Sequence, residues 1–404
     1  MKDTVFKTKL IIREAYFKKV LPFIGKSLIK VFTGQRRVGK SYLMFQVMEH
    51  IQKIDKKANI IYINKEDFSY DSIKNAADLN SYILIRSDKK KKNYIFIDEI
   101  QEIADFEKAL RSLVLKDIYD VYCTGSNAML LSGELSSLLS GRFVEIKVYS
   151  LSYPEFLMFH KLKDSDAALD KYFRFGGFPY LIHLEQTDEV VAEYLKNILN
   201  TIVYRDIVAR YNVRNTHLLE QLIKFLADNT GSLFSSNSIS EFLKSQNIKI
   251  SPNQIQTYTG YLTNSYLMHK VERYDVVGKR IFETGEKYYF DNLGLRNSIW
   301  GYRQTDMGKI LENAVFNHLQ YKSYNIKTGI YQSNEIDFVC EKDNETIYIQ
   351  VALSLNSEKT IVREFGNLLK INDNYPKIVV TRDSFSGNTY KGVRHVQIRK
   401  FLME

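Results

Sequence analysis

The chain has 404 residues, of which 45% are hydrophobic, and its formal net charge at pH 7 is +10. This length exceeds that of one ordinary core, so we expect two or three domains, and the apolar content excludes a disordered chain. The two cysteines, Cys123 and Cys340, lie far apart without metal-ligand spacing, which excludes a disulfide framework or a zinc site.

The sequence also lacks the signals of membrane proteins. It contains no stretch of 18 apolar residues, and Met1 to Thr4 do not begin a signal peptide. We therefore expect a cytoplasmic protein that does not interact with a membrane. The positive net charge suits an anionic partner such as nucleic acid, although solubility alone is a sufficient reason for it.

A phosphate-binding pattern follows the first predicted strand, residues 27–32. It consists of two glycines five residues apart, then lysine and a hydroxyl residue, and residues 42–48 after it predict an apolar-faced helix. The backbone N–H groups of such a loop converge on a phosphate, Lys40 would reach the β- and γ-phosphates, and Ser41 would ligate Mg²⁺. We therefore predict a nucleoside triphosphate site made by Gly34, Gln35, Arg36, Arg37, Val38, Gly39, Lys40, Ser41 and Tyr42.

Two adjacent acids follow a later predicted strand. Residues 94–97 are apolar, and Asp98 and Glu99 come directly after them. An unpaired carboxylate at the end of a buried strand is costly, so this pair points to a function. We predict that Asp98 holds the Mg²⁺ shell and that Glu99 polarises the attacking water. Glu66, after the predicted strand 58–63, is interpreted as a surface residue.

Two further polar residues are candidates to complete the site. Asn127 follows the predicted strand 121–124 and, like Ser126, would sense the γ-phosphate and orient water. Arg142 lies between a predicted helix, residues 134–140, and a strand, residues 143–148. It either supplies positive charge to the transition state, from this subunit or a neighbour, or caps the helix. A role in a neighbouring subunit would require an oligomer.

The glycine loop and the acid pair resemble motifs of the AAA-type ATPases. The same holds for the segments Thr124-Gly125-Ser126-Asn127 and Ser140-Gly141-Arg142. More narrowly, the chain is similar to a bacterial and archaeal group in which an ATPase core precedes a C-terminal domain called DUF4143. The resemblance covers nearly the whole chain and implies ATP as the nucleotide and a helical lid over it. Candidate phosphate contacts from the lid are Arg174, Arg205 and Arg210, although ordinary ion pairing is the simpler interpretation of each.

The next region predicts three helices, residues 218–227, 238–245 and 253–262, and a hairpin of strands 268–274 and 280–284, with a further strand at 287–290. Three helices and a hairpin suggest a winged helix, which commonly binds duplex DNA through its third helix. Residues 251–268 contain no Lys or Arg, so phosphate attraction would come from flanking cations. These are Lys244, Lys249, Lys270, Arg273, Lys279 and Arg280. Winged helices also make protein contacts, so both kinds of partner stay open.

The last region carries acids in an order that is similar to the restriction-endonuclease-like nucleases. Residues 308–315 open a predicted helix with Glu312 near its start, Asp337 lies on a strand, and the next strand carries Gln350 and Ala352. In those nucleases carboxylates bind Mg²⁺ and a lysine steadies the attacking hydroxide. Gln350 stands where an acid is expected and Ala352 where the lysine belongs, so we predict a nuclease-like fold with an inactive centre.

These patterns together predict a multidomain α/β ATPase. We expect a P-loop AAA-type core with a parallel sheet over 1–151, a helical lid over 152–215, a winged-helix-like domain over 216–295, and a restriction-endonuclease-like DUF4143 domain over 296–404. Mg²⁺-dependent ATP hydrolysis would drive a conformational change in a C-terminal half that binds duplex DNA or protein. The alternatives are an ATP-gated Mg²⁺-dependent nuclease and a nucleotide-dependent protein adaptor without DNA binding.

Overall fold

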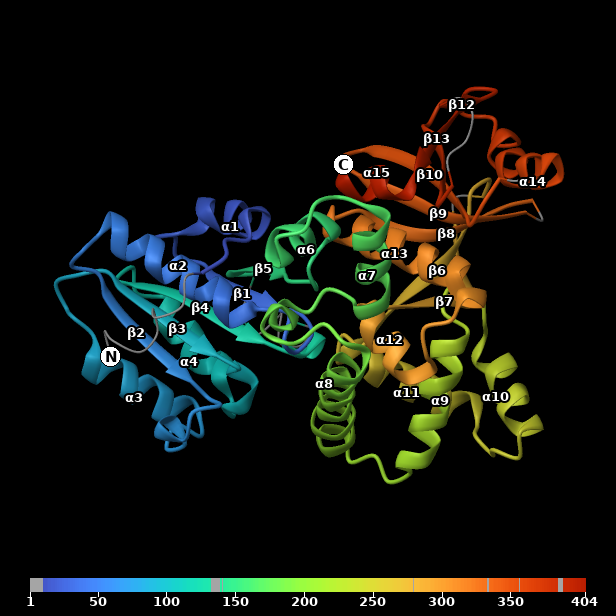
Figure 1. Ribbon diagram of the computed structural model, residues 1–404. Coiled ribbons are helices and arrows are strands. Elements are labelled where there is room, and N and C mark those ends of the chain that lie inside the picture. The colour runs from blue at the N-terminus through green and yellow to red at the C-terminus, as the bar shows by residue number, and fades with distance from the viewer. Residues whose placement is uncertain are drawn as a thin grey trace. The chain divides into compact units, whose positions relative to one another are not determined.

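The structure is a computed structural model that describes residues 10–131, 139, 141–278, 280–332, 334–355, 357–383 and 388–404 (Figure 1). It divides into two units, Met1–Tyr149 with Asn264–Tyr266, and Ser150–Thr263 with Leu267–Glu404. The helix predicted at 134–140 falls almost entirely outside the described residues. Within the described ranges, no helix combines the length and the apolar character that a membrane span needs.

The first unit is built on a parallel five-stranded sheet in the order β2-β3-β4-β1-β5 (Figure 1). Its strands are β1 Ile29–Thr33, β2 Asn59–Asn64, β3 Asn93–Asp98, β4 Tyr119–Gly125 and β5 Phe143–Lys147. Its helices are α1 Glu14–Val20, α2 Lys40–Ile54, α3 Ala76–Arg86 and α4 Phe106–Val114, with short 3-10 turns η1 Leu21–Phe23, η2 Phe68–Tyr70, η3 Ile100–Glu102 and η4 Ala128–Leu131. This is the parallel sheet with helices that the P-loop prediction requires.

The apolar strands bury both faces of this sheet. Alternate residues such as Ile95 and Ile97 of β3 pack with Leu110 of α4, in a core that α3 also joins. On the other face, Phe96 stacks on Tyr122 of β4 with ring centroids 4.5 Å apart. Because both faces are covered, polar side chains that need a ligand are found at the strand ends.

A buried ion pair lies inside the same sheet. The side chains of Lys30 on β1 and Asp120 on β4 have no exposed surface, and they contact each other directly. Asp120 also accepts hydrogen bonds from the Tyr122 hydroxyl at 2.8 Å and from the Gly25 N–H at 2.7 Å. Burial lowers the pKa of Lys30, and the adjacent Asp120 carboxylate opposes that shift. The pair therefore holds two charges in the core that each depend on the other.

Helices form the first half of the second unit. They are α6 Tyr153–His160, α7 Asp166–Phe175, η5 Pro179–His183, α8 Asp188–Asn200, a π-helical segment η6 Thr201–Ala209, α9 Thr216–Asp228, α10 Ser236–Ser245, α11 Pro252–Asn264, α12 Leu293–Trp300 and η7 Gln304–Asp306. Helix α12 contacts α7, α8 and α9. At its centre the buried Arg296 donates to the Asp306 carboxylate at 2.6 Å and to the Ala227 carbonyl at 2.9 Å. Helices α7, α8 and α9 therefore pack around α12.

The second sheet is mixed and has eight strands in the order β12-β13-β11-β10-β9-β8-β6-β7. The strands are β6 Met268–Asp275, β7 Arg280–Phe290, β8 Asn325–Tyr331, β9 Asn334–Lys342, β10 Glu345–Ala352, β11 Lys377–Thr381, β12 Thr389–Tyr390 and β13 Val393–Gln397. Helices α13 Met307–Tyr321, α14 Glu358–Leu369 and α15 Ile398–Met403 accompany them, and each contacts strands of this sheet.

The predicted hairpin differs from the expectation in two ways. First, β7 is one continuous strand, where two short strands were expected. Gly285 adopts a φ of 92° within it, and the pairing with β6 shifts between Glu272 and Tyr274, so the ladder bends without ending. Second, β6 pairs in parallel with β8. The hairpin therefore belongs to the same sheet as the C-terminal strands, whereas the sequence pattern groups it with α9 to α11.

His318 on α13 gives the second unit a measurable pH dependence. Its ring is buried against Phe401, and burial, aided by the nearby Lys322 charge, lowers its pKa to about 3. The unfolded chain takes up a proton below about pH 6.5 and the folded chain does not, so stability falls by about 1.4 kcal/mol per pH unit as the pH drops below 6.5.

We expect His318→Leu to remove this part of the acid destabilisation, about 2 kcal/mol between pH 7 and pH 5. The chain's single tryptophan, Trp300, lies in this unit, so its fluorescence during urea unfolding reports the change. The exposed His217 supplies the control, because His217→Leu should leave the pH dependence as it is in the parent. Equal acid sensitivity in His318→Leu and the parent would contradict the assignment.

Candidate nucleotide site

The loop between β1 and α2 has the backbone of an anion-binding turn. Gly34, Arg37 and Gly39 adopt left-handed φ values of 140°, 67° and 96°. Gly34 has no room for a side chain, because a Cβ atom there would lie 2.1 Å from the carbonyl oxygen of Val148. Helix α2 begins at Lys40, so the loop leads directly into the positive end of a helix dipole. Loop and helix end together present the converging N–H groups that a phosphate needs.

Lys40 is held inside this loop. Its side chain is buried, and its ammonium donates to the carbonyl oxygens of Gly34 and Gln35, at 2.9 Å each. Arg36 is also buried and pairs with Glu66 at 3.0 Å. Glu66, interpreted from the sequence as a surface residue, is 46% exposed and contacts the loop through this pair. By contrast, Tyr42 on the first turn of α2 is exposed, with its ring 5.9 Å from that of Phe45.

Asp98 and Ser41 are brought together at the end of β3. The buried Asp98 carboxylate is hydrogen-bonded to the Ser41 hydroxyl. It also accepts from Thr124 Oγ1 at 2.5 Å and from the Tyr62 hydroxyl at 3.3 Å. Burial raises the pKa of Asp98, while the hydrogen bonds from Ser41 and Thr124 oppose the rise. A carboxylate beside a serine hydroxyl is an oxygen donor set of the kind that Mg²⁺ prefers, so these residues fit the ion.

Glu99 is held in an unusual conformation by its neighbours. Its φ is 55°, which costs a non-glycine residue about 1–3 kcal/mol. The Glu99 N–H donates to Thr124 Oγ1 at 2.8 Å, and Ser126 Oγ donates to Glu99 Oε2 at 3.0 Å. Gln101 Nε2 also donates to Glu99 Oε2 and to Ser126 Oγ. A strained residue fixed by this many contacts is typical of a functional site.

The charges around Glu99 keep it ionised. Burial alone would raise its pKa, but the positive charges of Lys40 and Arg36 and the hydrogen bonds from Gln101 and Ser126 outweigh burial and hold the pKa below its usual range. An ionised carboxylate can accept a proton from water. Sequence reasoning did not find Gln101, because a glutamine in a short polar turn carries no pattern that distinguishes it.

Asn127 lies at the same edge of the sheet, after the end of β4. Its side chain is buried, and its Oδ1 accepts from the Met129 N–H at 2.9 Å, at the start of η4. The structure thus places Asn127 near the strand ends that carry Asp98 and Glu99, with its carbonyl oxygen engaged in a local turn.

Arg142 lies at the end of the sheet where β1 begins, opposite the end that carries the glycine loop. Its carbonyl accepts from the N–H of Ile29, the first residue of β1, whereas the loop follows the last residue of that strand. Five residues of strand span about 16 Å. The Arg142 side chain is exposed. The structure therefore does not bring Arg142 to the loop of its own chain.

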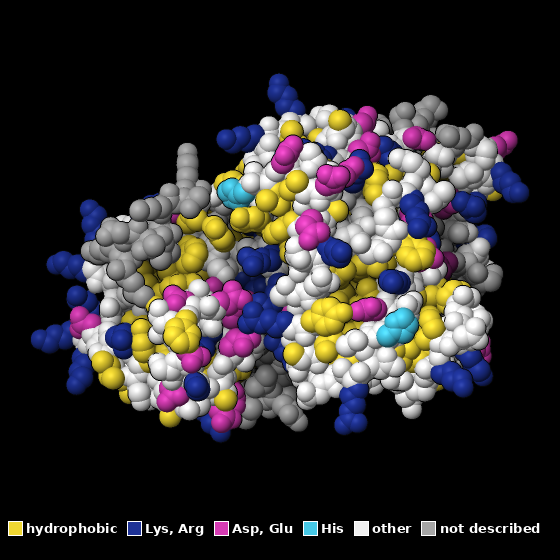
Figure 2. All heavy atoms as spheres, turned by 60° about the horizontal axis from the view of Figure 1, so that its bottom comes forward, with side chains coloured by type: hydrophobic (Ala, Val, Ile, Leu, Met, Phe, Trp, Pro, Cys, Tyr) yellow, Lys and Arg dark blue, Asp and Glu magenta, His cyan; other side chains and the backbone are white. Residues whose placement is uncertain are grey.

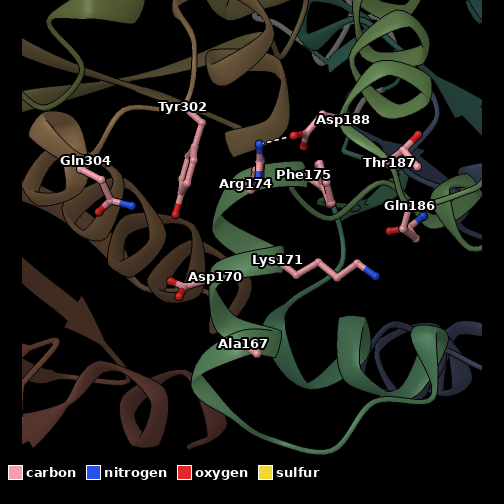
Figure 3. Close-up of a pocket in the computed structure, with 10 residues that line it drawn as sticks. All are labelled: Ala167, Asp170, Lys171, Arg174, Phe175, Gln186, Thr187, Asp188, Tyr302 and Gln304. Carbon is pink, nitrogen blue, oxygen red and sulfur yellow. Dashed lines mark hydrogen bonds and ion pairs between the residues drawn. The ribbon is translucent and has the colours of Figure 1, made fainter.

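Two of the three arginines considered for the lid, Arg174 and Arg210, have acidic neighbours. Arg174 pairs with Asp188, and Arg210 lies 4.0 Å from Asp206. Arg174 also lines a cavity of about 600 Å³ within the second unit, opposite Tyr302 (Figure 3). A dashed line in Figure 3 marks the ion pair between Arg174 and Asp188. For Arg174 and Arg210, the contacts agree with ordinary ion pairing.

The nuclease-like residues converge as well, but around a lysine. Glu312 on α13 and Asp337 on β9 both contact Lys287 on β7, at 2.9 and 3.5 Å, and the Asp337 N–H donates to Gln350 Oε1 on β10 at 3.4 Å. Burial, with the nearby Glu312 charge, raises the pKa of Asp337 to about 8, against the opposing effect of Lys287. Within the described ranges, no group of three or more His, Cys, Asp or Glu residues is arranged to hold a metal ion. Sequence reasoning missed Lys287 because it lies on a hairpin that we had placed in another domain.

Comparison with known proteins gives three adjoining family matches: "AAA domain" over residues 26–157, "Domain of unknown function (DUF8612)" over 166–306, and "Domain of unknown function (DUF4143)" over 307–400. An uncharacterized protein of Haemophilus influenzae is 37% identical over 402 residues, which covers 98% of this chain and 99% of that protein. An uncharacterized protein of Methanocaldococcus jannaschii is 29% identical over 370 residues, covering 87% and 79%. Among solved structures, the Walker-type ATPase of Pyrococcus abyssi covers 72% of this chain and 96% of its own, with 14% identity and a TM-score of 0.49.

Proposed function

This chain belongs to the family of AAA-domain proteins that end in a DUF4143 domain, and on that premise we propose that it is a Mg²⁺-dependent ATPase. The observation that carries the proposal is the setting of Glu99, a buried acid with a φ of 55° that directly follows β3. Lys40 and Arg36 of the phosphate-type loop keep this carboxylate ionised, and Gln101 and Ser126 hold it. An oriented, ionised acid beside a phosphate loop is what water activation requires.

Each residue of the site has a role in this proposal. The N–H groups of Gly34 to Ser41, together with Lys40, bind the phosphates of ATP, and Ser41 and Asp98 hold the ion. Bound Mg²⁺ supplies positive charge against the phosphate oxygens. Glu99 accepts a proton from the attacking water, and Asn127 orients that water or senses the γ-phosphate. The choice of ATP over other nucleoside triphosphates follows from the family.

Arg142 enters the proposal as a residue that acts on a neighbouring subunit. The exposed Arg142 side chain lies at the start of β1, far from the glycine loop of the same chain. This position supports a role on a neighbouring subunit over a role within its own subunit. A transition-state cation supplied in this way requires an oligomer.

We assign the second unit the role of binding a partner, with duplex DNA considered first and protein second. The net charge of +10 is that of the whole chain and lies mostly in the first unit, so it supports an anionic partner of the protein, whereas the assignment to the second unit follows from the three predicted helices and the hairpin. On the face drawn in Figure 2, basic side chains are interspersed with acidic and hydrophobic ones, so the partner's identity has to come from experiment. The two cysteines are free and buried, in keeping with a cytoplasmic location.

The test is phosphate release from ATP with Mg²⁺, with and without duplex DNA. We expect turnover in the parent and a loss of about 10²–10³-fold in Lys40→Ala, because a cation on the phosphates is removed. Lys53→Ala is the matched control, since Lys53 is exposed on the same helix and pairs with Glu49. Acceleration by DNA, weakened by salt, would favour the DNA partner, and turnover indifferent to DNA would favour protein. A parent that binds ATP without hydrolysing it would overturn the proposal.

A further inference from the structure

The acid cluster of the second unit surrounds the ammonium of Lys287 on three sides. The ammonium lies 2.7 Å from Glu335 Oε1, 2.9 Å from Glu312 Oε1 and 3.5 Å from Asp337 Oδ1. The Lys287 side chain is 2% exposed. One N–H of the ammonium is hydrogen-bonded to Glu312, and the carboxylates of Glu335 and Asp337 lie within ion-pair distance of the same ammonium. The acids that a divalent cation would need are therefore already paired with a cation of the chain itself.

The oxygens around this centre have further partners. Glu312 Oε1 also accepts from the Tyr289 hydroxyl at 2.6 Å, and Asp337 Oδ2 accepts from the Val351 N–H at 2.8 Å. Glu312 Oε1, which already accepts from two protein donors, offers little to a metal, whose ligands must approach to about 2.0–2.6 Å. Glu312 and Asp337 are thus both engaged with donors of the chain.

The strand that carries Lys287 is fixed next to the cluster. Asn313, the residue after Glu312, accepts from the Phe290 N–H and donates to the Phe290 carbonyl, at 2.9 Å each. Asn317, one turn further along α13, donates to the Asp291 carbonyl at 3.1 Å. These bonds pair the end of β7 with α13, so the position of Lys287 depends on backbone contacts and not on its side chain alone.

The order of Glu312 on α13, Asp337 on β9 and the β10 position that Gln350 occupies implies a divalent cation, and the residues present do not fit one. We propose that the Lys287 ammonium takes the place of this cation between Glu312, Glu335 and Asp337, which closes the centre to metal and fastens the β6–β7 hairpin to the DUF4143 domain. The inference is independent of the ATPase proposal, because none of these residues belongs to the nucleotide site.

The test measures Mn²⁺ binding to the full chain without nucleotide, by the electron paramagnetic resonance signal of free Mn²⁺. A Mn²⁺ site belongs to this centre if Glu312→Gln removes it. We expect the parent to have no such site and Lys287→Met to gain one, because three carboxylates lose their internal cation. Lys270→Met is the matched control: Lys270 lies on the same hairpin, half-exposed, and pairs with Glu272 and Glu286. It should gain no site.

Removal of a buried cation among acids is destabilising, so folding is measured beside binding. If Lys287→Met is destabilised but still folds, Mn²⁺ should raise its midpoint of thermal unfolding, followed by Trp300 fluorescence. In that case Mn²⁺ binding is measured on the double variant Lys287→Met/Glu335→Gln. It leaves two carboxylates without the lysine and removes the charge of the most exposed acid, Glu335. A parent site that Glu312→Gln abolishes would overturn the proposal. So would the absence of any Mn²⁺ effect on both folding and binding in the two variants.

Discussion

Glu99→Gln is expected to reduce ATP turnover by about 10²–10⁴-fold, the usual contribution of a general base, and to leave ATP binding nearly unchanged. The substitution keeps the shape of the side chain and its ability to accept hydrogen bonds from Gln101 and Ser126. It removes the charge that Lys40 and Arg36 maintain and with it the ability to take a proton. Single-turnover phosphate release and fluorescent-nucleotide titration together separate chemistry from binding.

Glu102→Gln is the matched control for this prediction. Glu102 is exposed three residues further along the chain, so the same chemical change there should leave turnover within about twofold. If Glu99→Gln retains most of the parent's turnover, water activation belongs to another group. If it loses nucleotide affinity to the same degree as turnover, the role of Glu99 is structural.

Asp120→Ala is expected to destabilise the first unit by about 3–5 kcal/mol, because it leaves the Lys30 ammonium buried without a counter-charge. Lys30 must then either stay charged in the core or release its proton, and both alternatives cost free energy. Loss of the carboxylate also leaves the Tyr122 hydroxyl and the Gly25 N–H without this acceptor. Urea unfolding followed by circular dichroism, with hydrogen exchange of β1 and β4, measures the effect.

The double variant Lys30→Met/Asp120→Leu should recover most of that loss, since replacing both partners of a buried pair by apolar residues is often neutral. Asp117→Ala is the surface control. Asp117 accepts a hydrogen bond from Ser27 in an exposed position, and its removal should cost less than about 0.5 kcal/mol. A cost below about 1 kcal/mol for Asp120→Ala would show that water or another cation already compensates the pair.

The sequence predicted the first unit well because local signals there agree with the fold. The strand expected at 94–99 is β3 Asn93–Asp98, and the helix expected after the glycine loop is part of α2 Lys40–Ile54. Buried parallel strands appear as apolar runs, and the ligand-binding groups follow their ends, so Lys40, Ser41, Asp98 and Glu99 could be named and are found at one edge of the sheet. Their catalytic roles stay predictions.

The second unit was less predictable because its arrangement depends on contacts distant in sequence. A glycine in a strand reads as a break, so β7 was divided at Gly285, and the parallel pairing of β6 with β8 leaves no local pattern. The position of Lys287 in the acid cluster was unpredictable for the same reason. A lysine in an alternating strand is expected to face water, and nothing within its own hairpin indicates Glu312, 25 residues later in the sequence.

The position of β1 has a consequence for how the protein is made. Its neighbours in the sheet are β4 and β5, which end at Gly125 and Lys147, while β2 and β3, which are synthesised earlier, lie further away. The glycine loop therefore leaves the ribosome long before the strands that fix both sides of β1, and before Val148, against which Gly34 packs. Nucleotide cannot assist the early steps of folding, and such non-local pairing is slow. In a refolding experiment, nucleotide binding should appear last, as a signal that the whole sheet has closed.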